Sequence, residues 1–76
     1  MAKSIYSDQQ AALIAALVAA RKQARLTQQQ VADRLGKPQS FVAKYENGER
    51  RLDVIEFLHV AEALEADPVE MLKRIL

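Results

Sequence analysis

Apolar residues recur at intervals of three and four along most of the chain, which is typical of amphipathic helices that bury one face. The first third shows this pattern at Leu13, Ile14, Leu17 and Ala20. Ser7 followed three residues later by Gln10 matches a capping box, a reciprocal pair of hydrogen bonds at a helix start. We therefore expect a first helix from about Asp8 to Ala24, preceded by a flexible segment at residues 1–7.

Capping signals divide the rest of the chain into four shorter helices. Thr27 and Gln30 form a second capping box, and Gly36 supplies the left-handed residue that commonly ends a helix. Pro38 favours the first turn of a third helix, which extends to about Glu46. The other signals are Asn47-Gly48, Asp53 with Glu56, and Asp67-Pro68 with Glu70. The sequence predicts an all-α fold, a compact bundle of five short helices in a single domain, residues 1–76.

The composition argues against several classes of function. The chain has no cysteine and a single histidine, His59, so it lacks the ligands for a thiolate or multi-histidine metal site. It shows no arrangement of a nucleophile with its base and no glycine-rich phosphate loop. Its longest apolar run, residues 11–20, is too short to cross a membrane. We expect a cytoplasmic, non-enzymatic domain without a metal or other cofactor.

Charge is distributed unevenly along the chain. Residues 21–51 contain eight Lys or Arg and three Asp or Glu, whereas the remainder contains three and seven. A basic middle segment is suited to a polyanionic partner. Charge alone does not decide between such a partner and an ordinary solvated helix surface.

The middle segment also has the layout of a helix-turn-helix. Residues 28–35 and 39–46 are two short helical segments joined by Gly36-Lys37-Pro38. Helical spacing turns Val31, Leu35, Val42 and Tyr45 inward and leaves Gln39, Ser40, Phe41 and Lys44 on the outer side of the second helix. In a helix-turn-helix the first helix braces the second, which enters the major groove of DNA by its N-terminal residues.

Three short motifs occur together at fixed separations: Leu26-Thr27-Gln28, Ala32 with Gly36, and Glu46-Asn47-Gly48. With these motifs, the chain from about residue 13 to residue 76 resembles the phage-repressor-like helix-turn-helix regulators of Cro/Xre type. The resemblance implies a lambda-repressor-like DNA-binding domain with its motif at about 28–46. It also implies a bacterial or phage transcriptional regulator, a repressor or autoregulator that binds specific sequences of double-stranded DNA.

The resemblance further implies roles for individual residues. Base contacts are expected from Gln39, Ser40, Phe41 and Lys44. Glutamine can bind adenine through two hydrogen bonds, lysine can bind guanine, and an aromatic ring can pack on the thymine methyl group. Contacts with the DNA backbone are expected from Gln28, Gln29, Lys37, Asn47, Arg50 and Arg51. Arg21 and Glu46 match a structural ion pair between the first and third helices.

Some positions have a second explanation. Gln29 is equally well explained as a polar residue at a helix start, and Lys37 as part of an exposed turn. We expect Phe41 on the surface, because two other side chains of its helix already face inward. Arg25 and Glu65 stand where the family commonly has glycine, and at Arg25 this favours a longer first helix.

A module of this size buries roughly 600–1,000 Å² on DNA, so specific binding normally needs two half-sites. We therefore expect a homodimer on a pseudo-palindromic operator. The candidate dimer surface consists of Ile55, Val60, Leu72, Ile75 and Leu76, although these apolar residues could equally complete the core. A different function stays open, that of an antitoxin or coactivator-type interaction module with a toxin or other protein as its partner.

Overall fold

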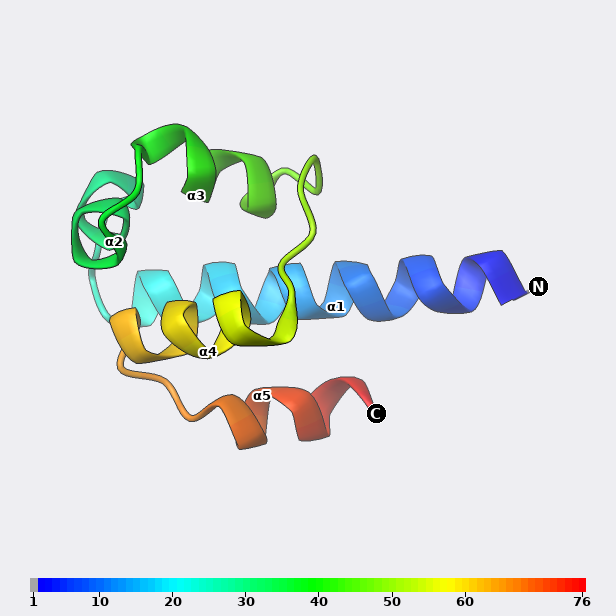
Figure 1. Cartoon of the computed structure of the whole chain (residues 1–76). Coiled ribbons are helices and arrows are strands. Elements are labelled where there is room, and N and C mark those ends of the chain that lie inside the picture. The colour runs from blue at the N-terminus through cyan, green and yellow to red at the C-terminus, as the bar shows by residue number, and fades with distance from the viewer. Residues whose placement is uncertain (1) are drawn as a thin grey trace.

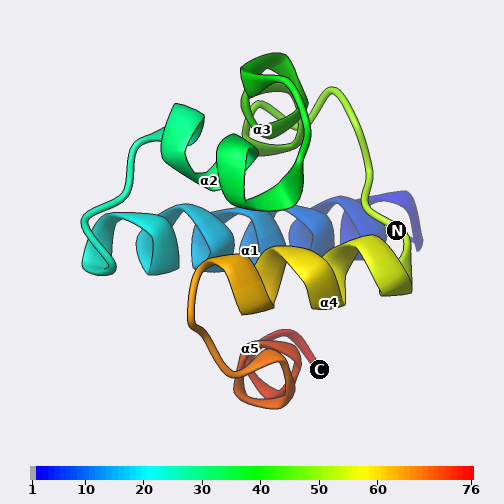
Figure 2. The same ribbon diagram turned by 60° about the vertical axis from the view of Figure 1, so that its left-hand side comes forward.

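The computed structural model describes the backbone of residues 2–76 and the side chains of residues 8–76. Its elements are α1 (Ala2–Gln23), α2 (Gln28–Leu35), α3 (Gln39–Glu46), α4 (Val54–Ala63) and α5 (Pro68–Ile75). Helices α2 and α3 lie over one side of the long α1, α5 packs along α1, and α4 contacts both α2 and α5 (Figures 1 and 2). The predicted all-α bundle of five helices is confirmed. None of the helices in the described part is both long and apolar enough to cross a membrane.

The first helix is longer at its start than the sequence predicted. It begins at Ala2, so Ser7 lies inside the helix and the N-cap that we expected there is wrong. The segment that we expected to be flexible, residues 1–7, is helical from Ala2, while Met1 lies outside the described residues. At the other end α1 stops at Gln23 and is not extended by Arg25, which adopts a left-handed conformation with φ of 60°.

Local capping explains the starts of α2, α4 and α5. Helices α2, α4 and α5 begin directly after Thr27, Asp53 and Asp67, as predicted. At α2, the Thr27 hydroxyl accepts from the Gln30 backbone N–H at 3.1 Å, and the Oε1 atom of the Gln30 side chain accepts from the Thr27 backbone N–H at 2.8 Å. Gly36 then ends α2 with φ of 67°, a conformation that a Cβ atom would oppose. The short turn between α2 and α3 follows from this geometry.

The core lies at the centre of the bundle, and each of the five helices contributes at least one buried side chain to it. Its most buried large side chains are Tyr45, Leu17, Val31, Val42 and Val60. Ala32 is fully buried, and its small side chain permits α2 and α3 to pack closely. The Tyr45 hydroxyl is also buried and lacks a hydrogen-bond partner among the described residues. Burial raises the pKa of Tyr45, because the charged form would lose its hydration.

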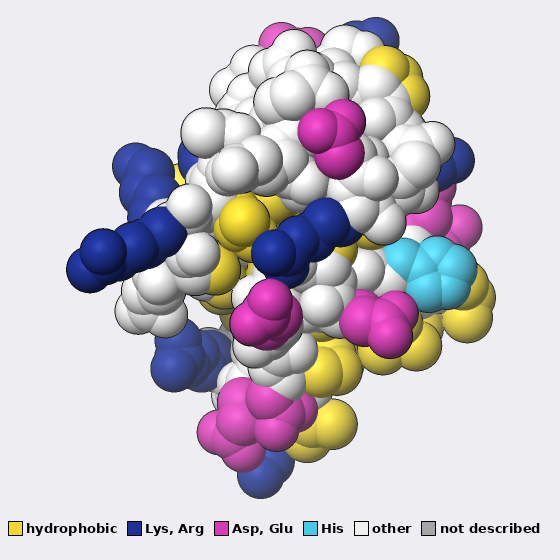
Figure 3. Space-filling model, turned by 90° about the vertical axis from the view of Figure 1, so that its left-hand side faces the viewer, with side chains coloured by type: hydrophobic (Ala, Val, Ile, Leu, Met, Phe, Trp, Pro, Cys, Tyr) yellow, Lys and Arg dark blue, Asp and Glu magenta, His cyan; other side chains and the backbone are white. Residues whose placement is uncertain are grey.

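Val60 corrects one sequence-based assignment. Its side chain is only 1% exposed and packs in the core, so its expected place on a dimer surface is wrong. The exposed large apolar side chains of the described part are instead Val54, Ile55, Leu58, Val69, Leu72 and Leu76, all on or directly after α4 and α5. In Figure 3, hydrophobic side chains gather along the right-hand and lower edges of the molecule, beside the single histidine. These six residues are called the α4–α5 apolar face below.

Candidate nucleic-acid interface

Helix α3 lies at the outer edge of the bundle, where it is braced by α2 (Figure 1). Its inward residues, Val42 and Tyr45, are 0% and 1% exposed, which fixes the rotation of the helix about its axis. Three polar residues on the opposite side, Gln39, Ser40 and Lys44, are exposed. The helix therefore presents an amide, a hydroxyl and an ammonium group to solvent from a rigid support.

The C-terminal end of α3 is joined to α1 by an ion pair. The Arg21 Nε atom donates to Glu46 Oε2 at 2.7 Å, and Arg21 Nη2 donates to Glu46 Oε1 at 3.1 Å. The two side chains are only 15% and 5% exposed. Arg21 also donates to the Leu26 carbonyl at 2.9 Å, and its hydrogen bond with Glu46 raises the pKa of the guanidinium. The structure thus brings the two predicted members of this pair together.

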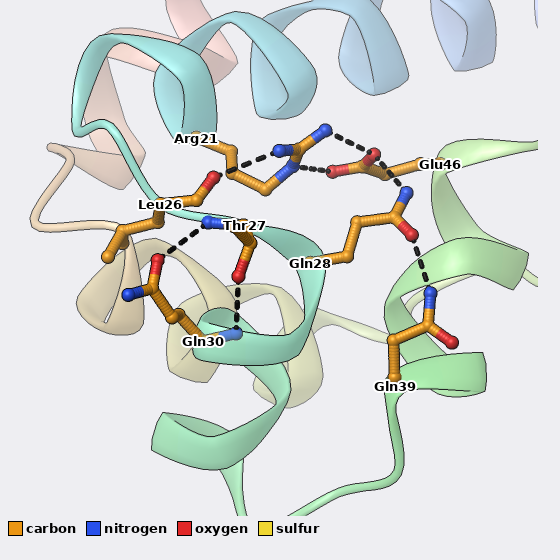
Figure 4. Close-up of polar contacts among 7 residues, drawn as sticks. All are labelled: Arg21, Leu26, Thr27, Gln28, Gln30, Gln39 and Glu46. Atoms are coloured by element: carbon orange, nitrogen blue, oxygen red, sulfur yellow. Dashed lines mark hydrogen bonds and ion pairs between the residues drawn. The ribbon is translucent and has the colours of Figure 1, made fainter.

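Gln28 connects the ion pair to the outer side of α3. Its Nε2 atom donates to Glu46 Oε1 at 2.8 Å, and its Oε1 atom accepts from Gln39 Nε2 at 2.7 Å (Figure 4). The side chain is partly buried between the two helices. Sequence reasoning placed Gln28 and Gln39 in separate roles, because helical spacing within one segment carries no signal for a contact between two helices.

Phe41 is only partly exposed, which corrects its expected place on the surface. Its ring packs edge-to-face on Tyr45 with the centroids 5.8 Å apart. The Arg50 guanidinium carbon lies 4.8 Å from the Phe41 ring centroid and Lys37 Nζ lies 5.6 Å from it. Two cations therefore lie close to the Phe41 ring, because the face of an aromatic ring attracts positive charge.

Some of the residues around α3 form hydrogen bonds or ion pairs within the protein, whereas others are exposed. Arg50 donates to both Glu56 carboxylate oxygens, at 3.0 and 2.8 Å, and to the Arg51 carbonyl at 2.9 Å. The Gln29 amide donates to Asp33 at 2.9 Å. Asn47 and Arg51 are exposed, and Arg51 forms no ion pair within the described part of the chain.

Arg34 belongs to the basic segment of the sequence but serves the fold. It donates to the Ala63 carbonyl at 2.8 Å and to Glu65 at 3.0 Å, where it binds the end of α4. Counting charges along the sequence could not separate this arginine from those that face solvent beside α3. Among residues 8–76, no cluster of His, Asp or Glu suits a metal ion.

Comparison with known proteins gives results in agreement with this geometry. A family model described as helix-turn-helix matches residues 17–71, which is more than half of the chain. The chain is similar to the solved structure of an XRE-family like protein from Pseudomonas syringae pv. tomato str. DC3000. The two are 46% identical with a TM-score of 0.94, over 97% of this chain and 90% of that one. No curated protein matches the sequence.

A second solved structure, the clp gene regulator ClgR from C. glutamicum, is 22% identical with a TM-score of 0.79. The alignment covers 88% of this chain and 87% of that one. At this level of identity the likeness concerns the fold.

Proposed function

Because the chain belongs to the Cro/Xre-type helix-turn-helix family, a family of DNA-binding transcription regulators, we propose that it regulates transcription by binding specific sequences in double-stranded DNA. Helix α3 reads base edges in the major groove, and the protein acts as a repressor or autoregulator. The observation that supports this most directly is the exposure of Gln39, Ser40 and Lys44 on one side of α3, whose opposite side is buried.

The proposed base contacts are the sequence-predicted ones. Gln39 faces adenine, Lys44 donates to guanine, and Ser40 bonds to either partner of a base pair. Phe41 reaches a thymine methyl group with the exposed part of its ring. Because Phe41 is partly buried, its contribution is smaller than that of the three polar residues.

The proposed backbone contacts surround α3 at both ends. They come from Gln28, Gln29, Lys37, Asn47, Arg50 and Arg51, with the N-terminus of α2 adding unpaired N–H groups that favour a phosphate. Arg50 is already paired with Glu56, so it contributes less to phosphate binding than Arg51 does. These contacts supply affinity that is independent of sequence and depends on salt.

The protein functions as a homodimer that joins its subunits through the α4–α5 apolar face. Ile55, Leu72 and Leu76 are 60%, 38% and 94% exposed, and Ile75 lies partly buried beside them. Helix α5 lies well away from α3 (Figures 1 and 2), so pairing through this face leaves the outer side of α3 free. In such a dimer the two recognition helices lie about 34 Å apart, one turn of DNA.

The same apolar face is suited to a different protein partner, and this supports a second candidate function. An antitoxin or coactivator-type module would bind its partner through α4 and α5 and could bind DNA as well. A partner that co-purifies with the chain and occupies this face would favour that function over a homodimer.

Selection of binding sites from random DNA tests the proposed function. We expect the selected sequences to contain two related half-sites with centres about 10 base pairs apart. Enrichment of no sequence over the starting pool would contradict sequence-specific binding, even if the protein retains a salt-dependent affinity for all DNA.

A further inference from the structure

One chain of hydrogen bonds runs from the inside of the bundle to the outer side of α3. It starts at the ion pair of Arg21 with Glu46, continues through Gln28 at 2.8 Å and ends at Gln39 at 2.7 Å (Figure 4). The Glu46 side chain is 5% exposed, whereas Gln39 is exposed. A nearly buried charge is therefore connected to an amide on the outer side of α3.

Only one assignment of donors and acceptors is possible along this chain of hydrogen bonds. A carboxylate can only accept hydrogen bonds, and a guanidinium can only donate them. Gln28 must therefore turn its NH₂ group toward Glu46, which leaves its carbonyl oxygen toward Gln39. Gln39 must in turn direct its own NH₂ group toward Gln28. A reversed Gln28 amide would place its carbonyl oxygen against a carboxylate oxygen, and both hydrogen bonds would be lost.

We propose that Glu46 is a specificity-determining positioning residue, which fixes the amide orientation of Gln39 through Gln28 and so favours adenine over guanine. This inference rests on the proposed function. With one NH₂ hydrogen committed to Gln28, Gln39 retains one donor and one acceptor. Adenine presents a complementary donor and acceptor in the major groove, whereas guanine presents two acceptors.

An amide without this support can rotate by half a turn about its last side-chain bond. Its NH₂ group then lies opposite O6 of guanine, at the position where adenine carries its amino group, and its two free hydrogens can donate to O6 and N7 together. The anchored amide keeps its carbonyl oxygen at that position. With guanine, the Gln39 carbonyl oxygen and O6 would face each other, and both are acceptors. Glu46 thus acts on base choice without touching DNA, and Arg21 holds the carboxylate in place.

The test begins by locating the base pair that Gln39 reads. It is the position of the selected site at which Gln39→Ala abolishes the base preference. There we expect the unaltered protein to favour adenine over guanine by about 5- to 150-fold. Glu46→Gln replaces the acceptor-only group by an amide that can also donate, so we expect this preference to fall several-fold.

Arg21→Lys is the matched control, because it disturbs the same ion pair but retains the carboxylate. We expect Arg21→Lys to lower thermal stability and to keep the adenine preference. The double variant Arg21→Met with Glu46→Met covers the case in which Glu46→Gln does not fold, since it removes the acceptor without leaving an unpaired buried charge. It is expected to fold and to show the same reduced preference.

The adenine-to-guanine ratio separates a positioning role from a purely structural one. The inference is overturned if Glu46→Gln or the double variant keeps the ratio of the unaltered protein, or if Arg21→Lys loses it to the same extent. In those cases the unaltered protein still selects a sequence, so the proposed function stands. Absence of any sequence preference in the unaltered protein contradicts the proposed function itself, and this inference with it.

Discussion

Arg25 and Glu65 adopt a backbone conformation that favours glycine, with φ of 60° and 57°. Each follows a helix, and its N–H bonds back to the last turn, to the carbonyls of Lys22 and Glu62 at 3.0 Å. The Cβ atom in this conformation costs about 1 kcal/mol relative to glycine. Arg25 therefore ends α1 at a cost in stability instead of extending the helix.

Arg25→Gly is expected to raise the free energy of unfolding by about 0.5–1 kcal/mol, because it relieves this strain and the gain exceeds the added entropy of the unfolded chain. Urea denaturation measures the change. Arg25→Ala is the control, since it retains the Cβ atom and should leave stability close to that of the unaltered protein. Equal effects of the two substitutions would show that the backbone conformation carries no cost here.

The Glu56 carboxyl has a strongly altered acidity. Hydrogen bonds from Arg50 and from the Asp53 backbone N–H lower its pKa from 4.5 to about 2. Because the folded-state pKa is depressed, the charged form contributes stability above pH 4.5, and this contribution is lost as the pH falls from 4.5 to about 2.

Titration of the Glu56 side chain followed by NMR should therefore give a midpoint near pH 2. Arg50→Ala removes the main cause and is expected to move the midpoint back toward the ordinary glutamate value. In Glu56→Gln the stability should fall less steeply between pH 4.5 and 2. A midpoint near 4.5 in the unaltered protein would contradict the paired geometry of Arg50 and Glu56.

At the scale of single residues, the sequence predicts exposure better than it predicts contacts between side chains. Exposure on α3 followed helical spacing, so Gln39, Ser40 and Lys44 could be placed from the sequence. The pairing of Gln28 with Glu46 could not, because residues 18 positions apart meet only after the helices pack. The sequence therefore predicts which side chains face outward and leaves open which of them are already bound to each other.

At the scale of helices, prediction succeeded where the signals were local. The caps at Thr27, Asp53 and Asp67 form within a few residues, so sequence alone located them. The same type of pattern failed at Ser7, since no glycine or proline precedes it to stop a helix. A capping pattern marks a permitted start, and the preceding residues decide whether the helix continues through it.

Thr27→Ala should reduce the free energy of unfolding by about 0.5–2 kcal/mol, because the Gln30 N–H loses its acceptor at the start of α2. Thermal denaturation measures the effect, and Thr27→Ser, which keeps the hydroxyl, is the matched control. We expect the serine variant to lose much less stability than the alanine variant. Similar losses in both would mean that the Thr27 methyl group, and not the cap, stabilises this end of α2.

At the scale of the whole molecule, the protein has two surfaces of different character. Helices α2 and α3 present polar and basic groups, whereas α4 and α5 present the apolar face. The sequence indicated an excess of apolar residues in the C-terminal part, but it could not assign them to the core or to a dimer surface. Val60 proved to be core, while Ile55 is exposed on the same helix, because the rotation of α4 is set by packing against α2 and α5.

Sedimentation equilibrium should give the mass of two chains for the unaltered protein, with Leu72→Glu giving one. Leu72 is 38% exposed, so a carboxylate there remains hydrated in the free subunit but is buried without a partner in the dimer. Circular dichroism should show that the variant keeps its helices. A mass of one chain for the unaltered protein, both alone and with selected DNA, would contradict the proposed dimer.

Comparison of Lys44→Ala with Arg51→Ala, on the selected site and on random DNA, tests the central claim that the outer side of α3 reads bases. Lys44→Ala should cost about 1–3 kcal/mol on the selected site, with a much smaller loss on random DNA. Arg51→Ala should weaken binding to both alike and reduce the slope of log affinity against log salt by about one. Equal losses on both DNAs for Lys44→Ala would contradict base reading by α3.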